Sequence, residues 1–286
     1  NSIINLMGAV GAIITLAMIS ILIPKTAHPS YTRVFNSVAV LMVISITILL
    51  ITIREKRLAI EISHDDIDTE KEHVENVNKD TSMPKDVRRS LYFILASIFL
   101  WFVAYNAVTT AFSRYAVRVW NLQGGSFANA LMVATGAAIL SYIPIGIIST
   151  NIGRKKTIMA GIIMMSISYF FGFLFKEYSP MINVVFAFTG VGWAAINVNS
   201  YPMVVEMSKS SDVGKYTGLY YTFSMAAQVL TPILSGALLE NISYRTLFPY
   251  SLIFSLLSLC TMSMVRHGDS KPPKKSSALE HFAVDN

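Results

Sequence analysis

Amide and aromatic side chains occur inside the most apolar parts of this sequence, where they could bind a solute rich in hydroxyl groups. The amides are those of Asn106, Asn197, Asn199 and Gln228. An amide both donates and accepts hydrogen bonds, which suits a hydroxyl group. The accompanying rings and hydroxyls belong to Trp101, Tyr105, Thr110, Trp193 and Tyr201. We expect these nine residues to contact a hydroxylated solute, with Trp101, Tyr105 or Trp193 offering a flat face for stacking.

The polar residues recur at helical spacing, so each group falls on one side of a helix. Residues 99–116 carry such a stripe, and a second one comprises Tyr221, Ser224, Gln228, Thr231 and Ser235. The stretch 191–206, VGWAAINVNSYPMVVE, carries two polar rows and Pro202, which lacks an N–H and favours a kink. Such groups also bond across dry helix interfaces, at about 0.6 kcal/mol each. Three stripes together favour a water-filled pathway over that alternative.

Two charged residues lie close enough to the apolar segments to act in them. Arg114 either extends its guanidinium to the surface or contacts a solute. Glu206 follows the last apolar turn of 191–206, a depth that favours a gating or loop-anchoring role over proton coupling. Both alternatives stay open for Arg114.

The sequence contains no recognisable catalytic motif and no recognisable metal-binding motif. The sequence has no HExxH, no GxSxG and no paired aspartates within apolar segments, and its five histidines lie in loops or the tail. The acidic run 64–73 fails as an EF-hand, because Lys71 and Val77 stand where Gly and Glu are needed. Cys260, the single cysteine, is expected to be a small packing residue. We therefore expect no catalysis, no cofactor and no metal.

The elements that position these residues are long apolar segments. Of the 286 residues 53% are hydrophobic and 14% charged, where a soluble domain has about 25% charged residues. A helix needs about 20 apolar residues to cross a bilayer. We predict an all-α membrane protein with eight transmembrane helices, near residues 2–23, 34–53, 91–112, 128–149, 157–175, 180–205, 217–239 and 246–265.

The basic residues predict the orientation of these helices. If the even-numbered connections face the cytoplasm, that side holds 17 of the 23 Lys and Arg residues, and the other side holds 6. Cytoplasmic loops carry this excess, so we expect both ends in the cytoplasm of a multi-pass cell-membrane protein. The net charge of +6 is then explained by basic residues in the cytoplasmic loops, and no nucleic-acid partner is expected.

Polar stretches divide the chain. Residues 54–90 read as a cytoplasmic loop between two helical bundles, and 266–286 as a cytoplasmic tail. The first 53 residues would supply the last two helices of one bundle, and 91–265 a six-helix bundle. The chain starts without an initiating methionine or a basic stretch before its apolar run, so we expect it to continue a longer protein rather than to open with a signal peptide.

The loop GIISTNIGRKK at 146–156 resembles the signature G-x-x-x-D-R-x-G-R-R of the major facilitator superfamily. Gly146, Gly153, Arg154 and Lys155 match it, whereas Thr150 and Asn151 replace its acidic and basic residues. The resemblance implies a twelve-helix fold of which this chain is the C-terminal two-thirds, without roughly the first four helices. It also implies that Gly153, Arg154, Lys155 and Glu206 take part in gating, although the missing aspartate puts the usual charge relay in doubt.

Three segments, 99–116, 191–207 and 214–238, are similar to glycoside-pentoside-hexuronide:cation symporters and to sucrose and maltose proton symporters. This resemblance implies uptake of a sugar, as a di- or oligosaccharide glycoside, by cation-coupled alternating access, with H⁺ or Na⁺ as the coupling cation. It implies a monomer in the lipid bilayer as well. The alternatives are a non-transporting sensor or scaffold with a transporter fold, and a facilitator for another small polar solute.

Overall fold

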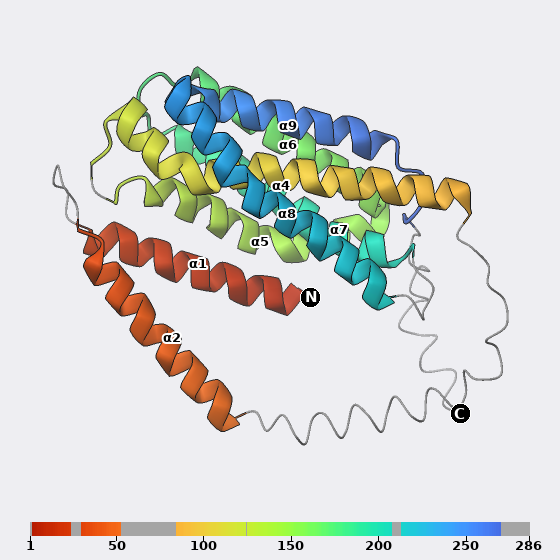
Figure 1. The fold of residues 1–286 in the computed structure, drawn as a ribbon, viewed down its shortest axis with the longest axis horizontal. Coiled ribbons are helices and arrows are strands. Elements are labelled where there is room, and N and C mark those ends of the chain that lie inside the picture. Colours follow the sequence, from red (N-terminus) through yellow and green to blue (C-terminus); the bar gives the residue numbers. More distant parts are fainter. Residues whose placement is uncertain (1, 24–29, 53–83, 124, 208–212, 270–286) are drawn as a thin grey trace. The chain divides into compact units, whose positions relative to one another are not determined.

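The computed structural model describes residues 2–23, 30–52, 84–123, 125–207 and 213–269. Within these ranges the secondary structure is helical (Figure 1). The elements are α1 (Ser2–Leu22), α2 (Thr32–Thr52), α4 (Lys85–Trp120), α5 (Ala128–Ile152), α6 (Arg154–Leu174), α7 (Ile182–Val205), α8 (Val213–Asn241), the short 3₁₀ helix η3 (Tyr244–Thr246) and α9 (Leu247–Ser263).

The prediction of an all-α membrane protein is confirmed. In the described part of the chain, seven helical segments are long and apolar enough to cross a bilayer, and α1 adds a shorter apolar helix over Val10–Leu22. The helices overrun the predicted apolar segments, most clearly in α4, whose 36 residues span about 54 Å. Hydropathy marks the part of a helix in hydrocarbon, whereas backbone hydrogen bonding continues beyond it. Lys85–Ser90, assigned to the loop 54–90, therefore begins α4.

The chain divides into two compact units, residues 1–29 with 85–286, and residues 30–84. The described helix of the second unit, α2, exposes apolar side chains along its length, as in Phe35, Leu41 and Ile51. A helix that is apolar on all sides suits a membrane span. The predicted domain boundaries remain predictions, and most of the loop 54–90, the acidic run 64–73 and the tail from 270 lie outside the described residues.

In the larger unit most of the packed helix pairs are not consecutive along the chain (Figure 1). Helix α7 packs against α5 and α6, α4 packs against α8 and α9, and α6 also touches α9. Helix α1 packs on α5. Glycines permit the closest approach: a Cβ on Gly161 would lie 2.6 Å from the Gly192 carbonyl oxygen, and one on Gly192 would lie 2.7 Å from that of Gly161. Small residues commonly let membrane helices meet this closely.

Large aromatic side chains fill one end of the unit. Phe112 and Trp120 of α4 surround Tyr115, and Phe186 of α7 and Phe248 of α9 pack against them. The Trp120 indole donates to the Phe175 carbonyl oxygen at 3.1 Å, so its polar tip is satisfied. This cluster fixes α4, α7 and α9 at that end.

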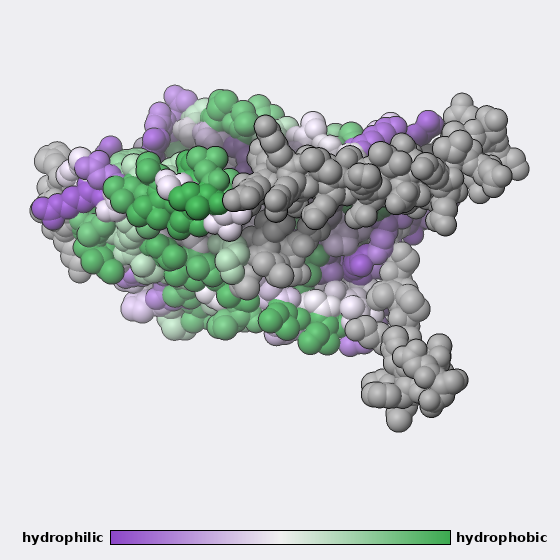
Figure 2. Space-filling view, turned by 90° about the horizontal axis from the view of Figure 1, so that it is seen from below, coloured by the Kyte–Doolittle hydropathy of each residue, from purple (hydrophilic) through white to green (hydrophobic). Residues whose placement is uncertain are grey.

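Hydrophobic side chains cover much of the left half of the view in Figure 2. Leu140 and Ile143 of α5 are more than three-quarters exposed, as expected for side chains that face lipid. Cys260 also lies on an exposed face of α9, which corrects the expectation of a packing role. The inner face of α9 carries Ser251, Ser255 and Ser258 instead, where Ser255 bonds Ser166 of α6 at 2.8 Å.

Candidate functional site

A cavity of about 450 Å³ lies between α1, α4, α5 and α7. Its hydroxyl-bearing lining residues are Thr15, Tyr105, Thr109, Thr135 and Thr189. Its apolar lining residues are Ala12, Leu16, Val108, Leu131, Ala134 and Phe186. None of these lining residues is charged. An uncharged, largely apolar cavity suits an uncharged ligand, because an ion would leave water without a partner of opposite charge.

The threonines of this cavity each donate to a carbonyl oxygen of their own helix. Thr15 donates to Gly11 at 3.0 Å, Thr109 to Tyr105 at 3.2 Å and Thr135 to Leu131 at 2.9 Å. Thr189 donates to Val185 at 3.1 Å. A hydroxyl that has given its proton still has lone pairs to accept with. In this conformation the threonine hydroxyl oxygens can therefore accept hydrogen bonds from a ligand, and the threonine methyl groups form apolar surface.

Tyr105 connects the cavity with the polar row of α7. Its ring stacks on Trp193, with ring centroids 3.7 Å apart and planes 3° from parallel. Its hydroxyl lies near the Tyr142 and Tyr169 hydroxyls, and the Asn197 amide lies close to the Tyr142 hydroxyl. Four helices, α4 to α7, thus bring aromatic hydroxyls and one amide together beside the cavity.

The other predicted solute ligands lie elsewhere. Trp101 and Asn199 are almost fully buried, and Asn199 donates to the Ala195 carbonyl oxygen at 2.8 Å. Asn106 likewise donates to Phe102 at 2.8 Å, and Thr110 is exposed. Polar side chains in helices often bond to the preceding turn in this way. These assignments stay predictions.

Tyr201 of α7 and Gln228 of α8 lie outside the cavity lining. The Tyr201 hydroxyl bonds Thr217 of α8 at 3.0 Å, and Ser200 bonds Tyr220 at 3.1 Å. Gln228 is exposed, with its amide nitrogen 3.9 Å from the Met225 sulfur. The second predicted stripe is split by burial, because Ser224, Thr231 and Ser235 are buried whereas Tyr221 and Gln228 are exposed.

The four predicted gating residues do come together, at the end of the bundle where α6 begins and α7 ends. Arg154 forms an ion pair with Glu206, and their side chains are 23% and 27% exposed. Lys155 donates to the carbonyl oxygens of Ser263 at 3.0 Å and Val265 at 2.6 Å. Gly153 has a φ of +99°, a conformation that favours glycine, and makes the turn between α5 and α6. We call this the Arg154 end.

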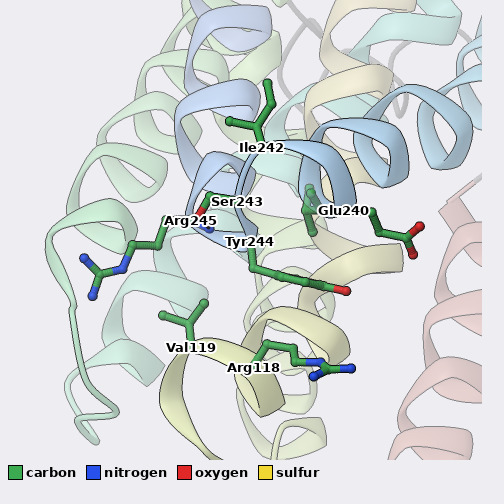
Figure 3. Close-up of a pocket in the computed structure, with 8 residues that line it drawn as sticks. Arg118, Val119, Glu240, Ile242, Ser243, Tyr244 and Arg245 are labelled. Carbon is green, nitrogen blue, oxygen red and sulfur yellow. Dashed lines mark hydrogen bonds between the residues drawn. The ribbon is translucent and has the colours of Figure 1, made fainter.

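A second cavity, of about 440 Å³, lies at the opposite end, between the end of α4 and the α8–α9 connection (Figure 3). Arg118 and Arg245 point to opposite sides of it in Figure 3, so they do not form one anion site. Arg114 pairs with Glu240 at 3.2 Å, and both side chains are more than half exposed. Arg114 thus reaches the surface, the first of the two alternatives considered for it.

Several residues of the site carry no clear signal in the sequence. The threonines Thr135 and Thr189 and the tyrosines Tyr142 and Tyr169 lie outside the three predicted stripes. A tyrosine in a membrane helix does place a polar tip on an apolar body, and that is the one signal available. Among the described residues, no group of His, Cys, Asp and Glu could hold a metal.

A model of the Major Facilitator Superfamily matches residues 120–284. Over 123 residues the chain is 25% identical to the chloramphenicol resistance protein CraA of Acinetobacter baumannii, covering 43% of this chain and 29% of that protein. Its fold is similar to that of a peptide transporter, POT, in complex with sulfate, with a TM-score of 0.57 and 16% identity over 68% of this chain and 42% of that one. The human organic anion transporter MFSD10 (TETRAN) gives a TM-score of 0.51 and 10% identity, over 66% and 50%. The chain thus spans half or less of these proteins' lengths.

Proposed function

This chain belongs to the major facilitator superfamily, and we propose that the protein is a secondary transporter that carries a small uncharged organic solute by alternating access. Members of this family are transporters rather than enzymes as a rule. The apolar helices and the family together make it a multi-pass membrane protein. The observation that supports the solute class is the cavity between α1, α4, α5 and α7, whose lining carries no charge.

The first candidate solute is a sugar, in the form of a di- or oligosaccharide glycoside, moved together with H⁺ or Na⁺. Its support is the resemblance of 99–116, 191–207 and 214–238 to sugar symporters. The Tyr105–Trp193 stack would provide the aromatic surface, and Tyr142 with Asn197 would bond the sugar hydroxyls. In this proposal the Arg154 end faces the cytoplasm, and the carrier acts as a monomer in the lipid bilayer.

The second candidate is an amphipathic organic molecule with an apolar ring and a few hydrogen-bond donors. Two observations favour it. Most cavity residues are apolar, and the threonine hydroxyls are placed to accept from a ligand rather than to donate. The similarity to CraA, named for chloramphenicol resistance, points the same way.

The test measures movement of two labelled solutes by the intact protein in lipid vesicles, with imposed pH or Na⁺ gradients. A labelled disaccharide represents the first candidate, and labelled chloramphenicol represents the second. We expect movement of one of them to respond to a gradient. Movement of neither, across a wider panel of neutral solutes, would support the sensor or scaffold alternative instead.

Variants of the cavity then test the site itself. Thr135→Val removes a lining hydroxyl at nearly constant volume, and Tyr105→Ala removes the ring that stacks on Trp193. We expect both to slow transport of the active solute. Thr222→Val is the matched control, because Thr222 of α8 also bonds its own helix but is exposed outside the cavity lining. Equal transport in all three variants would disprove the site assignment.

A further inference from the structure

The residues that follow α9, Val265–Asp269, cross the Arg154 end and touch three other helices; we call them the clasp. On α4, Ser90 accepts from the Arg266 backbone N–H at 3.1 Å and bonds the His267 ring at 3.0 Å. Asp86 of α4 lies 3.3 Å from the other nitrogen of that ring. The clasp is thereby tied to the first turns of α4.

The clasp also fits closely over the end of α7. Gly268 has a φ of +87°, and a Cβ added there would lie 2.7 Å from the Met203 carbonyl oxygen and 2.7 Å from the Met207 methyl carbon. The backbone can approach α7 this closely because residue 268 has no side chain.

Asp269 makes the contact with α6. Its carboxylate accepts the backbone N–H of Lys155 at 3.1 Å. It also lies against Gly153, where a Cβ would be 3.0 Å from the Asp269 Oδ2 atom, and it attracts the nearby Arg154 guanidinium. A carboxylate at this place bonds an N–H that the helix leaves unpaired and faces the positive end of the helix dipole.

The turn itself supplies no carboxylate for this purpose. Thr150 occupies the place where the resembled signature has its aspartate, and its hydroxyl donates to the Ile147 carbonyl oxygen of its own helix at 2.7 Å. The Lys155 side chain makes a second connection, because its ammonium donates to the carbonyl oxygens of Ser263 and Val265 at the end of α9. These contacts join α6 and α9 in both directions, and the Arg154–Glu206 pair extends the connection to α7.

We propose that Asp269 is a positioning residue that holds the Gly153–Lys155 turn under the clasp and thereby keeps the Arg154 end closed. Opening of that end then requires the Asp269 carboxylate to leave the start of α6, so that the ends of α6 and α7 can separate. The proposal rests on the proposed alternating access, because closure of one end matters only in a carrier.

The experiment measures maleimide labelling of single cysteines in the intact protein in lipid, with Cys260 replaced by serine. One reporter is Thr157→Cys, at a buried position one turn into α6, and the other is Ala128→Cys, buried at the opposite end. We expect Asp269→Asn to label about tenfold faster at position 157, because a neutral amide replaces a charge-assisted contact. Labelling at position 128 should fall, since opening one end of a carrier closes the other.

Three further variants make the result decisive. Asp269→Glu keeps the charge and should label within about twofold of the parent. Gly268→Ala displaces the clasp without changing the Asp269 side chain itself, and should act like Asp269→Asn even if that variant folds poorly. Glu177→Gln, an exposed carboxylate in the α6–α7 connection, is the matched control and should change nothing.

Faster labelling at position 157 with no change at 128 would mean that α6 merely frays, and would overturn the proposal. An unchanged rate at position 157 in both Asp269→Asn and Gly268→Ala would overturn it too. Transport is measured separately on the parent protein. A parent that labels as expected but moves no solute would contradict the proposed function, and one that transports while the labelling is unchanged would contradict the role of Asp269.

Discussion

Two ion pairs on the same chain have different surroundings, and this difference predicts their energies. The side chains of Arg154 and Glu206 are about one-quarter exposed, whereas those of Arg114 and Glu240 are more than 60% exposed. Water screens an exposed pair and flexible side chains lose entropy in forming it, so such pairs contribute about 0–1 kcal/mol. A partly buried pair loses less to screening, and removing one partner leaves a poorly solvated charge.

We therefore predict a coupling energy of about 1–2 kcal/mol for Arg154 with Glu206 and below about 0.5 kcal/mol for Arg114 with Glu240. Double-mutant cycles that replace each residue by glutamine measure both couplings as free energies of unfolding in detergent. The second pair serves as the control for effects of lost charge alone. Equal couplings in the two cycles would contradict the prediction.

The polar residues show how far a sequence specifies a site at this scale. Helical spacing placed Tyr105 and Trp193 each in the polar part of its own helix, and the structure stacks the two rings on one another. It did not indicate that Asn106 and Asn199 bond their own backbone, because that depends on a side-chain torsion rather than on position. Whether these two residues meet a solute stays a prediction.

The close packing of helix pairs depends on individual glycines, most clearly in the contact between α6 and α7. Gly161 and Gly192 face one another so closely that a methyl group on either would meet the carbonyl oxygen of the other helix. Backbone cannot move aside as a flexible side chain can, so the helices would have to separate along this interface.

We predict that Gly161→Ala and Gly192→Ala each lower the free energy of unfolding by about 1–3 kcal/mol. Gly136→Ala on α5 is the matched control, because a Cβ there meets nothing within 4 Å. Alanine also favours a helix by about 1 kcal/mol over glycine, so the control should be neutral or stabilising. A thermal unfolding midpoint that is unchanged in the first two variants would show that this interface can adjust.

The helices themselves could be predicted from the sequence far better than their partners. Apolar segments of bilayer length located the spans, since backbone hydrogen bonds leave few alternatives in lipid. Their pairing could not be read in the same way, because lipid-facing and helix-facing residues are both apolar. Leu140 of α5 faces outward and Ala138 packs inward, and hydropathy alone does not separate them.

At the scale of the whole molecule, segments that are far apart in the sequence form contacts and cavities together. Asp269 follows the last helix but contacts the start of α6, more than a hundred residues earlier. Thr15 of α1 and Thr135 of α5 line the same cavity. The sequence placed the gating residues near one another through a resembled signature, but it gave no local sign of Asp269 or of the cavity threonines. Such contacts depend on the packing of the complete bundle.

The absence of charge from the described cavity lining leads to a prediction about the transported solute. An ion in this cavity would lose its water without gaining an opposite charge, at a cost of several kcal/mol. We predict that a neutral solute competes for transport at least about tenfold better than a carboxylated or aminated analogue of the same size, since tenfold corresponds to about 1.4 kcal/mol. Competition for uptake of the active labelled solute into vesicles measures this ratio.

The variant Thr135→Asp tests the same physical cause in the opposite direction. A carboxylate in the cavity should make the neutral solute a weaker competitor for transport and the aminated analogue a stronger one. The reason is that the carboxylate supplies a negative charge opposite the ammonium group of that analogue. Thr222→Asp, on an exposed face of α8 outside the cavity lining, should leave both ratios unchanged. If charged and neutral analogues compete equally in the parent protein, this uncharged cavity is not the site that selects the solute.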